Sequence, residues 1–372
     1  MIYPLLPLFV TTVLGGGAAM LGTIEGMAET TASLLKLASG WWSDRVRRKP
    51  LVLFGYGVSA IARPLIGLAT APWHVLAVRM TDRVGKGVRT SPRDALLAAS
   101  AAPEARGRAF GFHRAADNLG AFVGPMVAWA LLQGPGLSLQ QVFLWSAVPG
   151  ALSIAVLVWF VGEKPRAAAS DAPVARVAPS AEPLGAPFWR YLAVVGLFTL
   201  GCSSDAFLLM RASQLGVATA LIPVLWATHN LLKSLASTPA GSLSDRIGRK
   251  PVIVVGWIVY AVVYLLFARA TSVWQAWALF AAYALYLGLV EGVEKALVAD
   301  LVPTARRGRA FGWFNFTVGI AALPASVVFG LVWQRWGAAT AFGMGAAFAG
   351  VAAVGLIALV PSAQQQREPG RE

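Results

Sequence analysis

The chain has 372 residues, of which 57% are hydrophobic and only 13% are charged, and its net charge is +14. A soluble domain carries roughly 25% charged residues, so this composition excludes a soluble enzyme or another water-facing globular protein of this size. The apolar residues lie in blocks, most of which reach the ~20 residues that cross a bilayer as a helix. Period-two alternation is absent, which argues against strands. The chain is therefore predicted to be an all-α polytopic membrane protein.

The apolar blocks predict twelve helical segments in chain order. In the first part of the chain they are 1–14, 17–39, 51–70, 73–98, 108–132 and 141–161. In the second part they are 188–210, 217–239, 252–269, 273–300, 309–333 and 337–360. The first segment is too short to span a membrane, and it lacks the basic lead of a signal peptide. We expect that the front of the first helix is missing from the sequence.

Two sequence motifs recur at one offset. GWWSDRVRRKP at 40–50 reappears as GSLSDRIGRKP at 241–251, and RGRAFG at 106–111 reappears at 307–312. The offset is 245 − 44 = 201 for the aspartates and 307 − 106 = 201 for the first arginines. A shared register indicates that a helical unit has been duplicated. The predicted domains are an N-terminal bundle over 1–162, a flexible cytoplasmic linker over 163–187, a C-terminal bundle over 188–361 and a cytoplasmic tail over 362–372.

The cations concentrate in alternate loops between the apolar blocks. The positive-inside rule places these loops and the C-terminus in the cytoplasm, so the net charge indicates orientation in a membrane rather than binding of nucleic acid. Cys202 is the only cysteine and the three histidines are isolated, which supports neither a disulfide nor a metal site. No phosphate-binding loop is present, so ATP is not the direct energy source. We expect no cofactor and, without a nucleophile–base constellation, no enzymatic activity.

The repeated loop resembles a motif of the major facilitator superfamily of secondary transporters, G-x-x-x-D-R-x-G-R-R/K, which lies between the second and third helices. The first copy has Arg47 where the family prefers glycine, and it matches at Gly40, Asp44, Arg45, Arg48 and Lys49. The second copy matches fully, at Gly241, Asp245, Arg246, Gly248, Arg249 and Lys250. The resemblance implies a fold of two homologous six-helix bundles, and charge networks in this loop that latch the cytoplasmic side shut.

The physical chemistry of the loop agrees with that role. Asp44 can pair with a neighbouring arginine or face the N-terminus of a helix. The alternative is that the cations simply anchor the loop on the cytoplasmic side.

Two further motifs of the family are met to different degrees. The fourth-helix motif R-x-x-Q-G-x-G is met only in part, by Arg79, Asp82, Arg83 and Gly85. The fifth-helix motif G-x-x-x-G-P, which is typical of the family's drug–proton antiporters, is met by Gly120, Gly124 and Pro125. Close helix packing with a bend is an alternative explanation for the fifth-helix residues.

Ionisable residues inside the membrane-spanning segments are candidates for the substrate and proton pathway. An arginine at the bilayer centre costs about 2.5–3.5 kcal/mol, so such residues face a wet cavity or protein partners. Buried carboxylates can also take up protons near neutral pH, although pairing with nearby cations as neutral struts is the alternative. The candidates are Glu25 and Glu29 in the second helix, Arg79, Asp82, Arg83 and Lys86 in the fourth, Asp205 in the seventh, and Glu291 and Glu294 in the tenth.

The predicted function is proton-coupled efflux of a small molecule by a monomeric secondary transporter of a bacterial inner membrane, working by alternating access. One alternative is proton-coupled uptake of an organic anion or nutrient. The basic stripe of the fourth helix, which consists of Arg79, Arg83, Lys86, Arg89 and Arg93, suits an anionic substrate equally well. The other is a membrane sensor or scaffold that transports nothing. Fold membership does not give the substrate or the direction of transport.

Overall fold

The computed structural model describes residues 6, 9–15, 18–162, 184–203, 205–218 and 221–361. Within these residues all regular secondary structure is helical, which confirms the predicted all-α class. The linker and tail predicted at 163–187 and 362–372 lie almost wholly outside the described residues, as does much of the short first segment.

The helices in the first part of the chain follow the apolar blocks. They are η1 (Phe9–Val13), α2 (Ala18–Ser43), α3 (Arg48–Leu65), η2 (Ile66–Leu68), α4 (Pro72–Ser100), η3 (Pro103–Ala105), α5 (Arg106–Gln133), α6 (Leu139–Trp145) and α7 (Ala147–Phe160). The segment predicted at 141–161 is divided into α6 and α7. It starts earlier than predicted because Ser138 and Gln141 form a reciprocal capping box, which satisfies two N–H groups at the start of α6.

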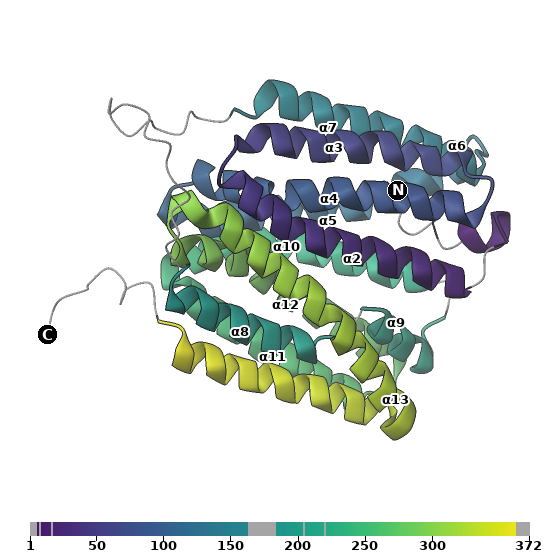
Figure 1. The fold of residues 1–372 in the computed structure, drawn as a ribbon. Coiled ribbons are helices and arrows are strands. Elements are labelled where there is room, and N and C mark those ends of the chain that lie inside the picture. The colour runs from purple at the N-terminus through teal and green to yellow at the C-terminus, as the bar shows by residue number, and fades with distance from the viewer. Residues whose placement is uncertain are drawn as a thin grey trace, which may run out of the picture. The chain divides into compact units, whose positions relative to one another are not determined.

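The helices in the second part include one interruption and one reversal. They are α8 (Ala186–Gly201), α9 (Asp205–Gln214), α10 (Ile222–Ile247), α11 (Arg249–Arg269), α12 (Val273–Leu301), η5 (Thr304–Arg306) and α13 (Arg307–Leu359). The segment predicted at 188–210 is interrupted after Gly201. Inside α13, Gly337 has a φ of 85°, which glycine adopts without strain, and the chain turns back on itself there (Figure 1).

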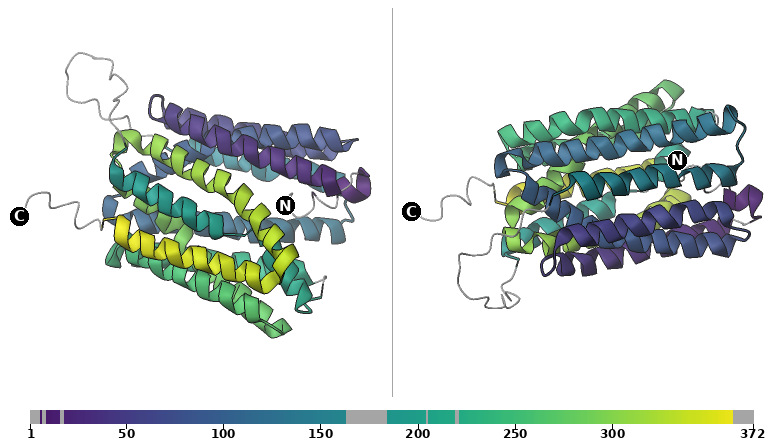
Figure 2. Two further views of the ribbon diagram at one scale, coloured as in Figure 1. Left: turned by 60° about the horizontal axis from the view of Figure 1, so that its bottom comes forward. Right: turned by 90° about the horizontal axis from the view of Figure 1, so that it is seen from above.

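The described residues belong to two compact units that share α5 and α13. Unit 1 is drawn from Met1–Leu96, Gly124–Gly185 and Val302–Phe316, and unit 2 from Leu97–Val123, Ala186–Leu301 and Thr317–Glu372. Within unit 1, α3 packs against α7 and α6, and within unit 2, α12 packs against α10 and α11 (Figures 1 and 2). The first turns of α5 therefore pack in unit 2, and the first turns of α13 pack in unit 1.

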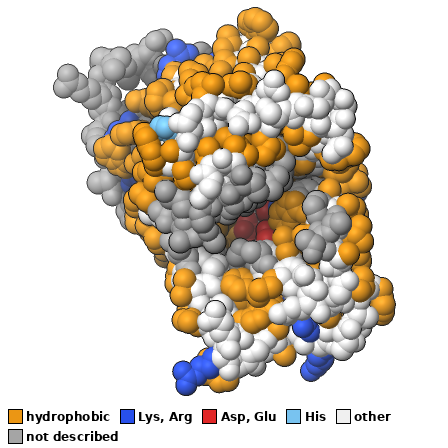
Figure 3. All heavy atoms as spheres, turned by 90° about the vertical axis from the view of Figure 1, so that its right-hand side faces the viewer, with side chains coloured by type: hydrophobic (Ala, Val, Ile, Leu, Met, Phe, Trp, Pro, Cys, Tyr) orange, Lys and Arg blue, Asp and Glu red, His pale blue; other side chains and the backbone are white. Residues whose placement is uncertain are grey.

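Large hydrophobic side chains lie on the exposed surface. Phe160, Trp159 and Ile61 are exposed by 80%, 77% and 70%. Exposure on this scale marks a surface that contacts lipid or another protein rather than water. Figure 3 shows a face on which hydrophobic side chains predominate, while the acidic side chains in view are set back behind neighbouring atoms. Six of the described helices are long and apolar enough to cross a membrane, so the chain has the features of a multi-pass membrane protein.

An aromatic core holds the helices of unit 2 together. The ring of Phe198 stacks on Trp257 at 4.4 Å between centroids, and Tyr260 stacks on Tyr264 at 4.0 Å. Aromatic pairs contribute about 0.5–1.5 kcal/mol each beyond the area they bury. This core fixes α8 against α11 and thereby positions the polar groups that lie beside it.

Candidate functional site

Asp44 follows α2 directly and caps the N-terminus of α13. Its two carboxylate oxygens accept hydrogen bonds from the backbone N–H of Gly308 at 2.9 Å and of Arg309 at 2.8 Å. The first N–H groups of a helix have no partner within it, and the helix dipole favours a negative charge there. An Arg48 nitrogen lies 4.0 Å from the same carboxylate, so both predicted geometries, the arginine pair and the helix N-terminus, occur together.

Burial sets the protonation behaviour of Asp44. It raises the pKa of the carboxyl above its ordinary range, and the two backbone N–H groups oppose that shift. Arg48 is itself held in place because it donates to the carbonyls of Ala95 at 3.2 Å and Thr304 at 3.4 Å. The carboxylate is thus part of a buried polar junction between α2 and the start of α13.

Asp245 repeats this arrangement in unit 2. It accepts hydrogen bonds from the backbone N–H of Gly107 at 2.9 Å and Arg108 at 2.8 Å, at the start of α5, and it is paired with Arg249. Arg249 lies 3.1 Å from Asp300, which is bound in turn by Arg106 at 2.5 Å. The second copy of the motif therefore holds a continuous network of two carboxylates and two guanidinium groups.

The motif glycines allow the backbones at these junctions to touch. A Cβ at Gly40 would lie 2.5 Å from the carbonyl oxygen of Gly308 and 2.7 Å from the Cα of Gly312. A Cβ at Gly241 would likewise meet the backbone of Gly107 and Arg108. Each of these glycines is required because no side chain fits between the two helices.

The remaining cations of the motif differ in what they contact. Lys49 donates to the carbonyl of Val158 near the end of α7, and Lys250 donates to the carbonyls of Ile357 and Val360 at the end of α13. Both lysines thus satisfy carbonyl groups at a helix C-terminus, which the helix dipole also favours. The guanidinium of Arg45 lies 3.2 Å from the ring of Trp41, and Arg246 is exposed.

The charged side chains predicted along the fourth helix, α4, contact two neighbouring helices, α3 and α2. Asp82 is buried and pairs with Arg63 of α3 at 2.9 Å and with Arg79 at 3.9 Å. Arg89 donates to Ser59 of α3 at 2.7 Å. The alternative of a structural strut thus has direct geometric support at Asp82.

The other side of α4 forms a polar cluster with Glu29 of α2. The Glu29 carboxylate lies 3.3 Å from Lys36, 3.7 Å from Arg83 and 3.7 Å from Lys86. The side chain of Glu29 is 47% exposed and that of Lys86 is 35% exposed. Three cations surround one carboxylate, so this Glu29 cluster has an excess positive charge in a partly open position. The side chain of Glu25, the other candidate on this helix, lies outside the described residues.

Unit 2 holds a second cluster around Glu291 of α12. The Glu291 carboxylate pairs with Lys233 of α10 at 2.8 Å and lies 3.8 Å from Arg114 of α5. Arg114 lies 3.9 Å from Asp117, which is also 3.8 Å from His113. The candidate Glu291 is therefore bound between cations of two other helices.

The other two carboxylates predicted in unit 2 have neutral partners. Glu294 accepts a hydrogen bond from the indole of Trp257 at 3.1 Å, and Asp205, the first residue of α9, accepts one from the hydroxyl of Tyr283 at 2.8 Å. The interruption after Gly201 brings Asp205 to the N-terminus of α9, where its charge is favourable.

Several side-chain partners of the site residues were not predicted from the sequence, among them Arg63, Trp257, Tyr283 and Asp300. Asp300 could have been suspected, since it is an acid at the end of a predicted helix. Its counterpart in the first half is 300 − 201 = 99, which is Ala99, so the repeat itself gives no indication of it.

The fifth-helix motif lies in α5, which contains Pro125 within the helix. A Cβ at Gly120 would meet no heavy atom within 4 Å. Close packing does not explain this glycine in the arrangement seen here.

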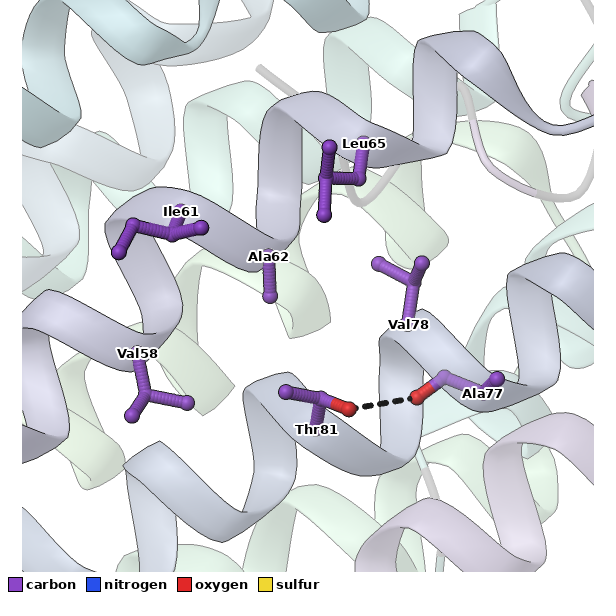
Figure 4. Close-up of a pocket in the computed structure, with 7 residues that line it drawn as sticks. All are labelled: Val58, Ile61, Ala62, Leu65, Ala77, Val78 and Thr81. Atoms are coloured by element: carbon purple, nitrogen blue, oxygen red, sulfur yellow. Dashed lines mark hydrogen bonds between the residues drawn. The ribbon is translucent and has the colours of Figure 1, made fainter.

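An apolar pocket of about 300 Å³ lies between α3 and α4 (Figure 4). Its lining residues are Val58, Ile61, Ala62, Leu65, Ala77, Val78 and Thr81. The Thr81 hydroxyl is engaged with the carbonyl of Ala77 at 2.9 Å, so the pocket offers little to a polar ligand. Among the described residues, no group of three or more His, Cys, Asp or Glu side chains could hold a metal ion.

Comparison with known proteins identifies the family. The chain is 35% identical over 341 residues to the uncharacterized MFS-type transporter MJ1317 of Methanocaldococcus jannaschii, covering 90% of this chain and 84% of that protein. It is 29% identical over 132 residues to the multidrug resistance protein MdtH of Photorhabdus laumondii, covering 36% and 33% of the two chains.

The fold is shared with solved structures. The proton:xylose symporter XylE bound to 6-bromo-6-deoxy-D-glucose superimposes with a TM-score of 0.73 at 15% identity, over 92% of this chain and 86% of that one. The sequence profile of the Major Facilitator Superfamily matches residues 1–228 and 206–372. The chain therefore belongs to the major facilitator superfamily and is a transporter rather than an enzyme.

Proposed function

We propose that the protein transports an organic anion together with protons, by alternating access in a bacterial inner membrane. The Glu29 cluster is the observation that carries this proposal. It has three cations for one carboxylate, and it lies partly open on helices predicted to cross the membrane. Charged groups avoid lipid, so the open side of the cluster faces water or a substrate.

The cluster provides a physical route to coupling. Protonation of Glu29 cancels its charge and removes one negative charge from beside Lys36, Arg83 and Lys86. A carboxylate or phosphate group of a substrate then replaces the lost charge, and the guanidinium of Arg83 suits it because planar donors bind such groups in pairs. Protonation and anion binding therefore favour each other. Because each ligand raises the affinity for the other, the proton and the anion are carried together.

We assign the opening and closing of the transporter to the two junctions at which Asp44 caps α13 and Asp245 caps α5. The Asp44 and Asp245 contacts each join a motif loop to the start of a helix from the other sequence half. Loss of these contacts would open the protein on the side where the motif loops lie, and their formation would close that side. The basic motif loops and the C-terminus are placed in the cytoplasm on the same proposal.

Flux in reconstituted vesicles tests the proposal. The purified protein is given radiolabelled aliphatic carboxylates, aromatic carboxylates, phosphate esters and cationic dyes, with and without an imposed pH gradient. We expect one of the anion classes to move with the gradient, and Arg83→Ala to abolish its binding. Glu29→Gln should keep anion binding but remove its pH dependence, whereas Arg335→Gln, which removes an exposed cation outside the motif loops, should change neither.

Proton-driven efflux of a drug-like molecule is the second candidate. It is favoured by the similarity to MdtH and by the residues Gly120, Gly124 and Pro125. It predicts that cells lacking the protein become sensitive to a toxic compound and that cationic dyes leave loaded vesicles. Movement of no compound in either assay would leave the sensor or scaffold as the better explanation.

A further inference from the structure

A second pocket, of about 520 Å³, lies in unit 1 where the end of α2 meets the start of α13. Its lining residues are Leu37, Ala38, Trp41, Trp42, Arg309 and Trp313. Three indole rings and one guanidinium group therefore define it, together with two small or aliphatic side chains. This composition differs from that of the apolar pocket between α3 and α4, because it combines broad apolar faces with a fixed positive charge.

The arginine that supplies the positive charge of the pocket has a hydrogen-bond donor without a partner among the described residues. The Arg309 Nε atom is buried and has no hydrogen-bond partner in the described part of the chain. A buried donor without a partner is unfavourable, so an acceptor at this point would stabilise it. A second cation lies close by, since Arg45 stacks on Trp41 at 3.2 Å.

The position of the pocket points to a membrane component. Trp41 and Trp42 are exposed by 46% and 45% at the end of α2, immediately before the basic motif loop. Tryptophan prefers the boundary between hydrocarbon and headgroups, and basic residues beside a membrane helix attract anionic lipids. The phosphate of a lipid and the guanidinium of Arg309 are complementary in charge and geometry.

We propose that this pocket binds the headgroup phosphate of an anionic phospholipid from the cytoplasmic leaflet. The phosphate accepts hydrogen bonds from Arg309, and the first carbons of the acyl chains lie on the indoles of Trp42 and Trp313. The volume of about 520 Å³ suits a glycerophosphate headgroup, which falls in the usual size range of ligand pockets.

Binding at this place would act on the junction between α2 and α13. The backbone N–H of Arg309 is one of the two groups that Asp44 caps, and the guanidinium of Arg309 also attracts the Asp44 carboxylate. A lipid phosphate bound by this side chain would therefore lie beside the capped junction. A bound lipid would hold the first turn of α13 against α2. We therefore expect anionic lipid to favour the docked junction, whatever the transported substrate is.

The test measures lipid binding and junction stability with the full-length protein. Purified protein in a neutral detergent is titrated with phosphatidylglycerol, phosphatidylcholine or inorganic phosphate, and binding is read by native mass spectrometry and by the melting temperature. We expect phosphatidylglycerol alone to bind and to raise the melting temperature, and Arg309→Gln to weaken its binding at least tenfold. Arg335→Gln is the matched control, because Arg335 also lies near an indole ring, 5.5 Å from that of Trp336.

Each other outcome would overturn the proposal. Phosphatidylcholine carries the same phosphate beside a cationic choline, so equal binding of this lipid would show that the site does not select an anionic headgroup. An equal effect of inorganic phosphate would identify a free-anion site. Unchanged lipid binding by Arg309→Gln would place the lipid elsewhere, and Arg309→Lys, which keeps the charge, checks that a loss of binding does not come from misfolding.

Discussion

Removal of the Asp245 carboxylate should release the start of α5 from the motif loop. Asp245→Ala deletes two charge-assisted hydrogen bonds, to the N–H groups of Gly107 and Arg108, and the ion pair with Arg249. A hydrogen bond to a charged group contributes about 1.5–3 kcal/mol, and loss of a helix cap costs about 0.5–2 kcal/mol. Because these contributions overlap, we expect a loss of about 2–4 kcal/mol. That loss corresponds to about a 30- to 1,000-fold shift away from the docked arrangement.

Spin-label distances across the junction measure this shift. Labels are attached at Arg108→Cys and Ile247→Cys, which replace exposed side chains on the two sides of the contact. The parent protein should give one short distance between the labels. Asp245→Ala should add a second, longer distance, and most molecules should show the longer one. Asp245→Asn, which keeps one acceptor, should fall between them, and Asp117→Asn, which changes a half-exposed carboxylate of α5, should leave the distances alone. Identical distance distributions for the parent and Asp245→Ala would refute the capping argument.

Three further predictions follow from the contacts. Gly40→Ala should lower the melting temperature through overpacking of about 1–3 kcal/mol against the backbone of α13, whereas Gly57→Ala, whose Cβ would meet nothing within 4 Å, should not lower it. Lys233→Met should destabilise the protein by about 3–5 kcal/mol because Glu291 loses its nearest cation, and adding Glu291→Gln should restore most of the stability in chemical denaturation. Burial raises the pKa of Asp44, so the protonated carboxyl favours the docked α2–α13 junction more than the carboxylate does. This pH-dependent part of the stability is complete below the ordinary carboxyl pKa of about 4 and is lost as the pH rises through the raised value. Spin-label distances across that junction should therefore shorten on acidification, and Asp44→Asn should abolish the effect.

The class of fold and the motif junctions could be predicted because they depend on local signals. Apolar length gave the helices, and the exact offset between Asp44 and Asp245 indicated a duplicated loop. The interruption after Gly201 could not be predicted in the same way, since membrane helices tolerate glycine and small residues without breaking. The reversal at Gly337 was placed correctly because a charged and polar stretch, which includes Arg335, separates two apolar blocks.

The partners of the charged side chains were harder to predict than their positions along the helices. A helical projection puts the cations of α4 within one broad arc, but long side chains reach to either side of their own backbone. Arg83 and Lys86 accordingly turn to Glu29, whereas Arg89 turns to α3. Which neighbour is chosen depends on how the helices pack, and the sequence of one helix does not contain that information.

The two motif copies share a backbone geometry but differ in their charge networks. Asp300 joins Arg249 to Arg106 in the second copy, whereas the first copy has Ala99 at the equivalent position, and Arg48 donates to backbone carbonyls instead. In the proposed alternating-access mechanism both junctions separate, so the cost of opening is the sum of their two contributions. Asp300→Asn should therefore promote opening at the α5 junction, seen as a longer distance between labels at Arg108→Cys and Ile247→Cys. An unchanged distance would mean that Asp245 holds α5 by itself and that the carboxylate of Asp300 adds no stability to the docked junction.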